Sequence, residues 1–244
     1  MASQQDFATV AENPNAGGQT YALLCFDLDG TLVDTASEIV EAVNRGLESC
    51  GVARRPFDTI LHLVGAGLHS LVSRLHVQVL QEQPGLAAQL PFERLLAEVD
   101  RHYIDTSGTT GVAYPGAVMA LARLRAAGVR VACVTNKETR HAQRVLAATG
   151  LDRHLELLIG GDTLPQRKPH ASVLTHVMQV FGVVPARTAH VGDSSIDVAA
   201  ARNAGVSAWA VDYGYNAGVP ISEARPDRLF GSLGAVAEQA LAGA

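Results

Sequence analysis

Strands and helices are expected to alternate over residues 115–244, and this pattern constrains the fold more than any other feature of the chain. Short apolar segments at 129–134, 155–159, 188–191 and 207–211 have the composition of buried strands. Helical spacing of apolar residues separates them, at about 117–127, 138–149, 173–181 and from about 196. Such alternation predicts a parallel sheet covered by helices on both faces.

A further strand is expected near the start of the chain, where Tyr21-Ala-Leu-Leu-Cys-Phe26 runs directly into Asp27. After it, Thr35-Ala-Ser-Glu38 has the form of a capping box that begins a helix. The chain then stays helix-like to about Gly111, with no strand as clean as the first. We therefore expect the first strand to join the later sheet and the helical stretch to be an insertion that follows it.

These elements predict an α/β fold, a doubly wound Rossmann-like parallel sheet core that carries an inserted α-helical cap domain. The expected organisation is a flexible N-terminal tail at 1–20, the α/β core at 21–34 and 112–244, and the helical cap at 35–111.

Composition excludes several classes of protein. With 48% hydrophobic and 18% charged residues the chain is globular rather than disordered. A formal charge of −5 argues against a nucleic-acid-binding surface, and no apolar run is long enough to cross a membrane. The three cysteines, Cys25, Cys50 and Cys133, form no CxxC pair, which favours a reducing compartment. We expect a cytoplasmic protein, either a monomer or a homodimer.

Polar side chains follow three of the expected strands, at the point where each strand ends. The residues are Asp27 and Asp29, Thr135 and Asn136, and Asp193 with Asp197. Ligands of open parallel sheets bind beyond the carboxyl ends of the strands. We therefore expect these residues to meet in one crevice although they lie far apart in the sequence.

The segment Asp27-Leu-Asp-Gly-Thr31 is the most specific of the three. An extended chain points Asp27 and Asp29 to the same side, and Gly30 lets the backbone turn away. Two carboxylates this close raise one pKa or attract a cation. An isolated DxDG is equally compatible with a turn or a calcium-like loop. The strand before it and Thr31 after it favour a functional site.

The second acidic cluster is Gly192-Asp193-Ser-Ser-Ile-Asp197. Ser194 and Asp197 could form a capping box for the next helix, a purely structural role. Asp193 lies outside that helix at a strand end. Together with Asp27 it supplies the hard oxygen ligands that Mg²⁺ requires.

The other candidate residues have ordinary structural alternatives. Thr135-Asn136 could cap a helix beginning near Glu138, and an isolated loop lysine such as Lys168 is usually solvated. Pro169 suits a first helical position. Four carboxylates and a bound phosphate ester, however, carry more negative charge than one Mg²⁺ and one lysine neutralise. The site is therefore expected to need the metal, Lys168 and one protonated carboxyl.

The order Asp27-Leu-Asp-Gly-Thr31, Thr135, Lys168-Pro169 and Gly192 to Asp197 resembles the four signature motifs of the haloacid dehalogenase superfamily. The helical insertion after the first motif resembles the C1 type of cap. Within the superfamily the chain is most similar to the phosphoglycolate phosphatase subfamily, through Val134-Thr-Asn-Lys137 and Tyr213-Gly-Tyr-Asn216 among other segments. The resemblance covers about residues 21–230.

The resemblance implies a Mg²⁺-dependent hydrolase of a small-molecule phosphate ester, most simply 2-phosphoglycolate. Asp27 is then the nucleophile that forms an aspartyl-phosphate, and Asp29 is the general acid and base. Thr135, Asn136 and Lys168 are implied to bind the phosphoryl group. The implied metal ligands are Asp27, Asp29 through its backbone carbonyl, Asp193 and, in support, Asp197.

Three points remain open at this level. The substrate's carboxylate is expected to meet a loop amide or a cation of the cap, and the candidate cations are Arg54, Arg55, Arg74 and His69. A β-phosphoglucomutase-like phosphomutase of the same superfamily would use Asp27 and Asp29 equally well. A non-catalytic sensor of a phosphometabolite is the alternative from another class, although neither carboxylate has been lost.

Overall fold

The computed structural model describes residues 21–242, so the tail expected at 1–20 lies outside the described residues. Its centre is a six-stranded sheet in the order β5-β4-β1-β6-β7-β8. All neighbouring strands of this sheet run parallel. The strands are β1 Leu23–Phe26, β4 Arg130–Val134, β5 Leu157–Ile159, β6 Thr188–Gly192, β7 Ser207–Val211 and β8 Arg228–Phe230. The sequence predicted five of them and missed β8, which has only three residues.

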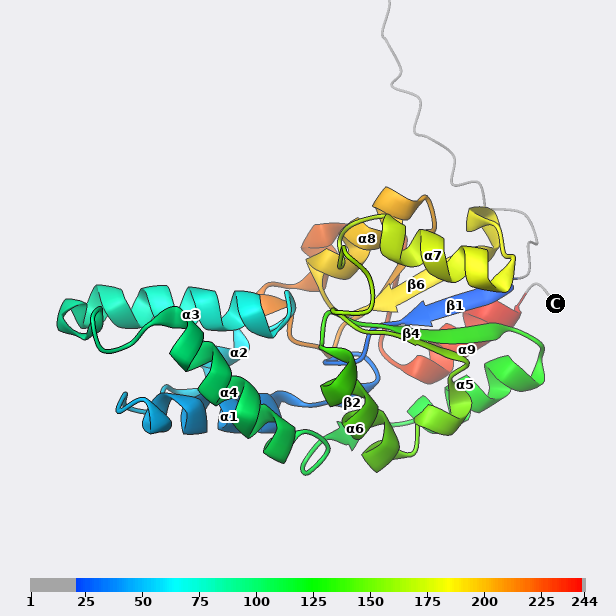
Figure 1. Cartoon of the computed structure of the whole chain (residues 1–244). Coiled ribbons are helices and arrows are strands. Elements are labelled where there is room, and N and C mark those ends of the chain that lie inside the picture. Colours follow the sequence, from blue (N-terminus) through cyan, green and yellow to red (C-terminus); the bar gives the residue numbers. More distant parts are fainter. Residues whose placement is uncertain (1–20, 243–244) are drawn as a thin grey trace, which may run out of the picture.

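Helices cover both faces of the sheet (Figure 1). One face carries α5 Ala117–Ala126, α6 Thr139–Thr149 and α9 Leu233–Leu241, and the other carries α7 Ser172–Phe181 and α8 Ser195–Ala204. Side chains of β1 alternate between the two layers, because Leu24 and Phe26 pack on the first face and Leu23 and Cys25 on the second. The doubly wound α/β fold expected from the sequence is confirmed.

The central strands are buried on both faces, as their continuous apolar runs predicted. Trp209 in β7 is 1% exposed, and its ring lies 4.7 Å from that of Tyr21 and 5.2 Å from that of Phe230. Cys25 and Cys133 are fully buried packing residues. Burial raises the pKa of the Cys25 thiol to about 12, so it is not poised as a nucleophile.

A group of helices lies to one side of the sheet, beyond the carboxyl ends of its strands (Figure 1). They are α1 Ala36–Ser49, α2 Phe57–Leu61, α3 Leu68–Glu82 and α4 Phe92–Thr106. These helices enclose a hydrophobic cluster of their own, which includes Val43, Leu75 and Val99. The chain enters through β2 Val33–Asp34 and leaves through β3 Val112–Ala113, which pair antiparallel. The boundaries 35–111 remain a prediction.

Short 3-10 helices occupy several of the connections: Pro84–Leu86, Asp152–His154, Pro185–Arg187, Asn216–Gly218 and Ile221–Ala224. The longest helices of residues 21–242 are α3 and α4, with 15 residues each. A membrane span needs about 20 apolar residues. None of the described helices is long and apolar enough to cross a bilayer.

The capping box expected at Thr35-Ala-Ser-Glu38 does not form, because both of its side chains have tertiary partners. Thr35 starts α1 without a side-chain cap, and its hydroxyl donates instead to Asp29. The Glu38 carboxylate accepts the backbone N–H groups of Gly108 and Gly111 at the other end of the insertion. The helix itself begins where expected. The hydroxyl oxygen of Tyr215 accepts the backbone N–H groups of Thr35, which precedes the helix, and of Ala36, its first residue.

Two structural alternatives raised for the candidate residues do not hold. Helix α7 begins at Ser172, next to the start expected from the apolar spacing at 173–181, and Pro169 lies in the preceding loop. Thr135 and Asn136 do not cap α6. Its first N–H, from Thr139, donates to the Asp162 carboxylate at 2.8 Å, so a residue from another loop satisfies the helix terminus.

Replacing Trp209 by alanine should lower the free energy of unfolding by about 3–5 kcal/mol, because it removes a fully buried aromatic side chain between two others. Urea unfolding followed by circular dichroism measures the change. Met119 in α5 is 68% exposed, so Met119→Ala is the control and should cost less than about 0.5 kcal/mol. Equal losses in the two variants would contradict the packing described for the sheet.

Candidate active site

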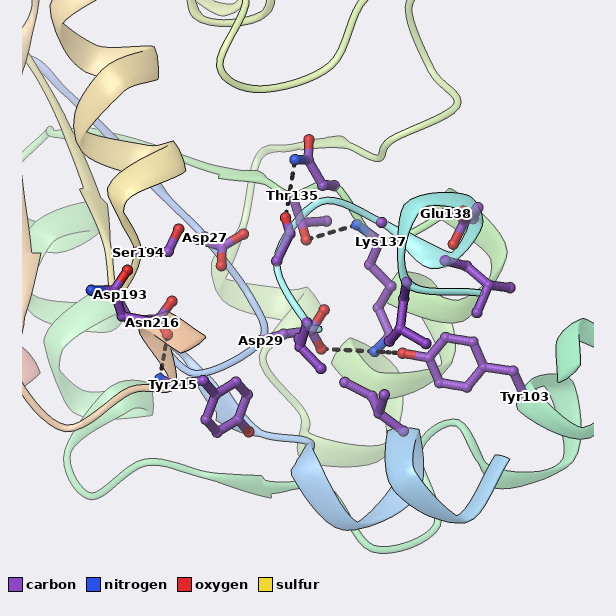
Figure 2. A pocket seen from close by; sticks show the side chains of 17 residues that line it. Asp27, Asp29, Tyr103, Thr135, Lys137, Glu138, Asp193, Ser194, Tyr215 and Asn216 are labelled. Atoms are coloured by element: carbon purple, nitrogen blue, oxygen red, sulfur yellow. Dashed lines mark hydrogen bonds and ion pairs between the residues drawn. The ribbon is translucent and has the colours of Figure 1, made fainter. Parts of the chain in front are cut away.

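Three neighbouring strands end at the same place, and each is followed by a polar residue (Figure 2). Asp27 follows β1, Thr135 follows β4 and Asp193 follows β6. Because β1 lies between β4 and β6, the three side chains line one pocket. The structure therefore brings Asp27, Thr135 and Asp193 together, as expected from their positions at the strand ends.

Asp27 lies at the centre of this arrangement. It is 7% exposed, and its Oδ1 accepts a hydrogen bond of 2.6 Å from Lys168 Nζ. Burial raises the pKa of Asp27 to about 7, and the charges of Asp197 and Asp29 add to the effect while Lys168 opposes it.

Lys168 is buried and paired rather than solvated. Its side chain is 2% exposed, and its ammonium donates to Asp27 at 2.6 Å and to Asp197 at 2.7 Å. Burial alone would lower the pKa of Lys168, but Asp197 and Asp27 together hold it above its ordinary value. A permanent positive charge is therefore fixed beside the Asp27 carboxylate.

Asp197 combines the two roles that the sequence left open. Its Oδ2 accepts from Ser194 N at 3.2 Å and Ser194 Oγ at 2.6 Å, which joins it to the start of α8. Its Oδ1 accepts from Lys168 and, at 2.9 Å, from the buried His190 Nε2. Burial would raise the pKa of Asp197, but Lys168 and His190 hold it well below its usual range. Asp197 thus stays charged and anchors Lys168.

Asp193 is held in place by the hydroxyl of Thr31 and by the backbone around it. Its carboxylate accepts from Thr31 Oγ1 at 3.1 Å and from Tyr215 N at 2.7 Å. A Cβ at Gly30 or Gly214 would come within 2.4 Å and 2.1 Å of this side chain, so both positions require glycine. Burial, with the charges of Asp27 and Asp197, raises the pKa of Asp193 to about 8.

The carboxylates fit a divalent cation. Asp27, Asp193 and Asp197 are all buried and each offers an oxygen within 4.8 Å of the others. Hard oxygen donors are those that small divalent cations prefer. Burial, reinforced by the charges of the neighbouring carboxylates, raises the pKa values of Asp27 and Asp193. A buried acidic cluster of this kind is suited to a bound metal ion.

Asp29 faces the same pocket from the side of the helical insertion (Figure 2). Its Oδ1 accepts from Thr35 Oγ1 at 2.6 Å and from Lys137 Nζ at 2.7 Å. The sequence assigned no role to Lys137. A usable signal was present, since Lys137 and Lys168 are the only two lysines of the chain, and both are buried here.

Thr135 and Asn136 differ in what they contact. Thr135 lines the pocket, and its hydroxyl accepts the backbone N–H of Lys137. Asn136 also lines it, but its amide donates to the backbone oxygens of Gly65 at 3.1 Å and Lys168 at 3.0 Å. Asn136 therefore links the insertion to the loop that carries Lys168.

The helical insertion forms the apolar wall of the pocket through Ile39, Val64, Leu68, Leu71 and Tyr103. The four cations considered for a substrate carboxylate are not among the lining residues. Arg54 pairs with Glu41, Arg55 pairs with Glu82, His69 packs on Phe92, and Arg74 is exposed. Gly65, Gly67 and Leu68 do line the pocket, so this loop lies where the arginines do not.

A doubly wound parallel sheet with an acidic cluster at the ends of its central strands, and helices inserted after the first, defines a Rossmann-like α/β protein whose ligand site lies beyond the carboxyl ends of the strands. The family model described as haloacid dehalogenase-like hydrolase matches residues 21–205. The chain belongs to this family.

Curated relatives carry a common description. The chain is 44% identical over 189 residues, 78% of this chain and 80% of the relative, to a protein of Cupriavidus necator named phosphoglycolate phosphatase, plasmid. It is 35% identical to a phosphoglycolate phosphatase of Psychrobacter arcticus, over 90% of this chain and 95% of the relative. A crystal structure of a predicted phosphoglycolate phosphatase from Haemophilus somnus is similar with a TM-score of 0.84 and 29% identity, covering 90% of this chain and 97% of that one.

Magnesium should stabilise the protein more at about pH 8 than at about pH 5. A carboxyl whose pKa is raised in the folded state binds protons more tightly there, so its contribution to stability is lost as the pH rises. For Asp193 this loss takes place between pH 3.8, the ordinary pKa of the carboxyl, and about pH 8, its raised pKa in the folded protein. Thermal unfolding of the metal-free protein should accordingly show a midpoint that falls across this interval. Added Mg²⁺ should raise the midpoint again, by about 2–4 °C for each kcal/mol of stabilisation in a chain of this length.

The variant Asp193→Asn serves as the control for this titration. It removes one of the two buried acids of the cluster whose pKa is raised, so both the fall in midpoint and the recovery with Mg²⁺ should shrink. An equal effect of Mg²⁺ at both pH values in the unchanged protein would mean that the acidic cluster does not hold the ion.

Proposed function

We propose that the chain hydrolyses 2-phosphoglycolate to glycolate and inorganic phosphate, with Mg²⁺ as cofactor and a phosphorylated Asp27 as intermediate. One observation carries the proposal: Asp27 opens on the pocket with a lysine 2.6 Å from its Oδ1 and Asp193 in the same carboxylate cluster. The relatives named phosphoglycolate phosphatase support the choice of substrate.

In the first step Asp27 attacks phosphorus and the bond from phosphorus to the leaving oxygen breaks. Thr135 and Lys168 hold the phosphoryl oxygens as negative charge develops on them. Asp29, on the other side of the pocket, gives its proton to the departing alkoxide. Glycolate leaves, and the phosphoryl group remains on the carboxylate of Asp27.

In the second step Asp29, now a carboxylate, takes a proton from water. The water oxygen attacks phosphorus, the bond to Asp27 breaks, and inorganic phosphate leaves. Asp29 ends protonated and Asp27 ends as a carboxylate, so both return to their starting states. The apolar wall of the insertion limits the water that reaches the intermediate.

Asp27, Asp193 and the backbone carbonyl of Asp29 are the groups that would hold Mg²⁺, with Asp197 in support. Bound there, the ion supplies positive charge that lets two carboxylates and a phosphate share one pocket. Asp197 acts chiefly through Lys168, since its four hydrogen bonds already occupy both oxygens.

The carboxylate of the substrate would meet backbone amides of the Gly65–Gly67 loop. The start of α3 does not serve, because the carboxylate of Glu138 already interacts there with the backbone N–H of Leu68. The pocket side chains from the insertion are otherwise apolar, apart from the hydroxyl of Tyr103. This favours a small substrate over a sugar phosphate with many hydroxyls.

A phosphomutase remains the second candidate, because Asp27 and Asp29 serve it equally well. It would return the phosphoryl group to a sugar hydroxyl instead of to water. A non-catalytic sensor is disfavoured by the intact set of Asp27, Asp29 and Lys168.

Asp27→Asn should lower turnover by at least about 10³-fold, as loss of a covalent nucleophile does in other enzymes. Release of inorganic phosphate measures it. Asp212, an exposed residue that follows β7 as Asp27 follows β1, provides the control. Asp212→Asn should keep its activity. Turnover of Asp27→Asn close to that of the unchanged protein would exclude Asp27 as nucleophile.

A panel of phosphate compounds tests the substrate, with 2-phosphoglycolate beside sugar phosphates, nucleotides and pyrophosphate. We expect the highest kcat/KM for 2-phosphoglycolate, loss of activity with a chelator, and recovery with Mg²⁺. Isomerised sugar phosphate without phosphate release would favour the mutase instead. Full activity in verified metal-free protein would refute the role of the cation.

A further inference from the structure

The Lys137 side chain joins the sheet core to the helical insertion at Asp29 (Figure 2). It follows β4, and its Nζ donates to Asp29 Oδ1 at 2.7 Å and to the hydroxyl of Tyr103 in α4. The same nitrogen lies 3.9 Å from Glu38 Oε1 in α1. Its side chain is 1% exposed. Lys137 thus contacts the proposed acid and base and two helices of the insertion at once.

These partners fix the ammonium in one place. A lysine ammonium has three donors, and burying it is costly unless each is satisfied. Asp29 and Tyr103 accept hydrogen bonds from the ammonium of Lys137. Its nitrogen also lies 4.7 Å from the centroid of the Tyr103 ring. The surrounding groups, rather than solvent, therefore determine where the charge sits.

We propose that Lys137 is a positioning residue for Asp29, an inference that rests on the proposed function. Lys137 and Thr35 both donate to Oδ1 of Asp29. Among the described residues no side-chain donor is bonded to Oδ2, and the residue lines the pocket. Lys137 therefore sets the rotation of the carboxyl group so that Oδ2 is the oxygen that exchanges a proton with the leaving group and with water.

The same contacts tie this alignment to the position of the insertion. Tyr103 holds the ammonium from α4, and its ring stacks on that of His141 in α6 with centroids 4.3 Å apart. His141 in turn contacts Asp100 of α4 at 3.0 Å. These contacts hold α4 against α6, and in this arrangement Asp29 is aligned for proton transfer. The insertion therefore positions the acid and also covers the pocket.

Substrates with different leaving groups test this role. The alkoxide released from 2-phosphoglycolate needs a proton, whereas the acetate released from acetyl phosphate does not. The value of kcat/KM reports only the steps up to departure of the leaving group. Lys137→Met should lower kcat/KM for 2-phosphoglycolate by about 10- to 100-fold, the usual effect of losing a group that orients a reacting residue. For acetyl phosphate the loss should stay within about threefold.

Three further variants complete the design. Asp29→Asn should show the same selective loss, and a larger one, of about 10²- to 10⁴-fold. Tyr103→Phe removes one hydroxyl and keeps the ring, so it tests the proposal even if Lys137→Met does not fold, and its loss should again fall on 2-phosphoglycolate. Arg144→Met removes an exposed cation from α6, the helix that begins two residues after Lys137, and should change neither value.

Equal losses on both compounds in Lys137→Met and Tyr103→Phe would overturn the proposal, since they indicate a role in folding or in binding the phosphoryl group. Unchanged activity on both would overturn it as well. Failure of the proposed function would give a different result. The unchanged protein would then not hydrolyse 2-phosphoglycolate, or Asp29→Asn would lower kcat/KM equally for 2-phosphoglycolate and acetyl phosphate.

Discussion

Repulsion among buried carboxylates is the constraint on which the rest of this structure depends. Asp27, Asp193 and Asp197 are brought within 4.8 Å of one another at the end of the sheet. One lysine cannot neutralise them. Burial, together with their mutual repulsion, raises the pKa of Asp27 to about 7 and that of Asp193 to about 8. The folded chain therefore holds a site suited to a divalent cation, which supplies the positive charge that the carboxylates lack.

The parallel sheet is the element that brings these carboxylates together. Its three central strands are buried on both faces and end side by side, so rigid backbone fixes Asp27, Thr135 and Asp193. The remaining contacts reach the site from the connections. Lys168 comes from the loop before α7, Tyr215 from the segment after β7, and the insertion brings Tyr103. The central strands thus fix the acidic residues, and residues from the loops and from the insertion complete the site around them.

Much of this could be predicted from the sequence. Apolar runs and strand-end polar residues were enough to predict the sheet and the meeting of Asp27, Thr135 and Asp193 at its edge, because these depend on local pattern and on the general geometry of parallel sheets. The nucleophile role predicted for Asp27 came instead from the resemblance to the haloacid dehalogenase superfamily. What was missed depends on tertiary partners. Thr35 and Glu38 have the spacing of a capping box, but Asp29 and the loop at Gly108 compete for their side chains. Likewise, nothing local indicates that Lys137 will be buried between Asp29 and Tyr103.

The account's central claim is that Asp27 becomes phosphorylated. The most direct measurement is to quench the reaction with 2-phosphoglycolate and Mg²⁺ within the first turnover, reduce the protein with borohydride, and sequence its peptides by mass spectrometry. An acyl phosphate is reduced to the alcohol, so homoserine at position 27 and at no other aspartate is the predicted result. An unmodified Asp27 under conditions that release phosphate, or homoserine at a different position, would contradict the account.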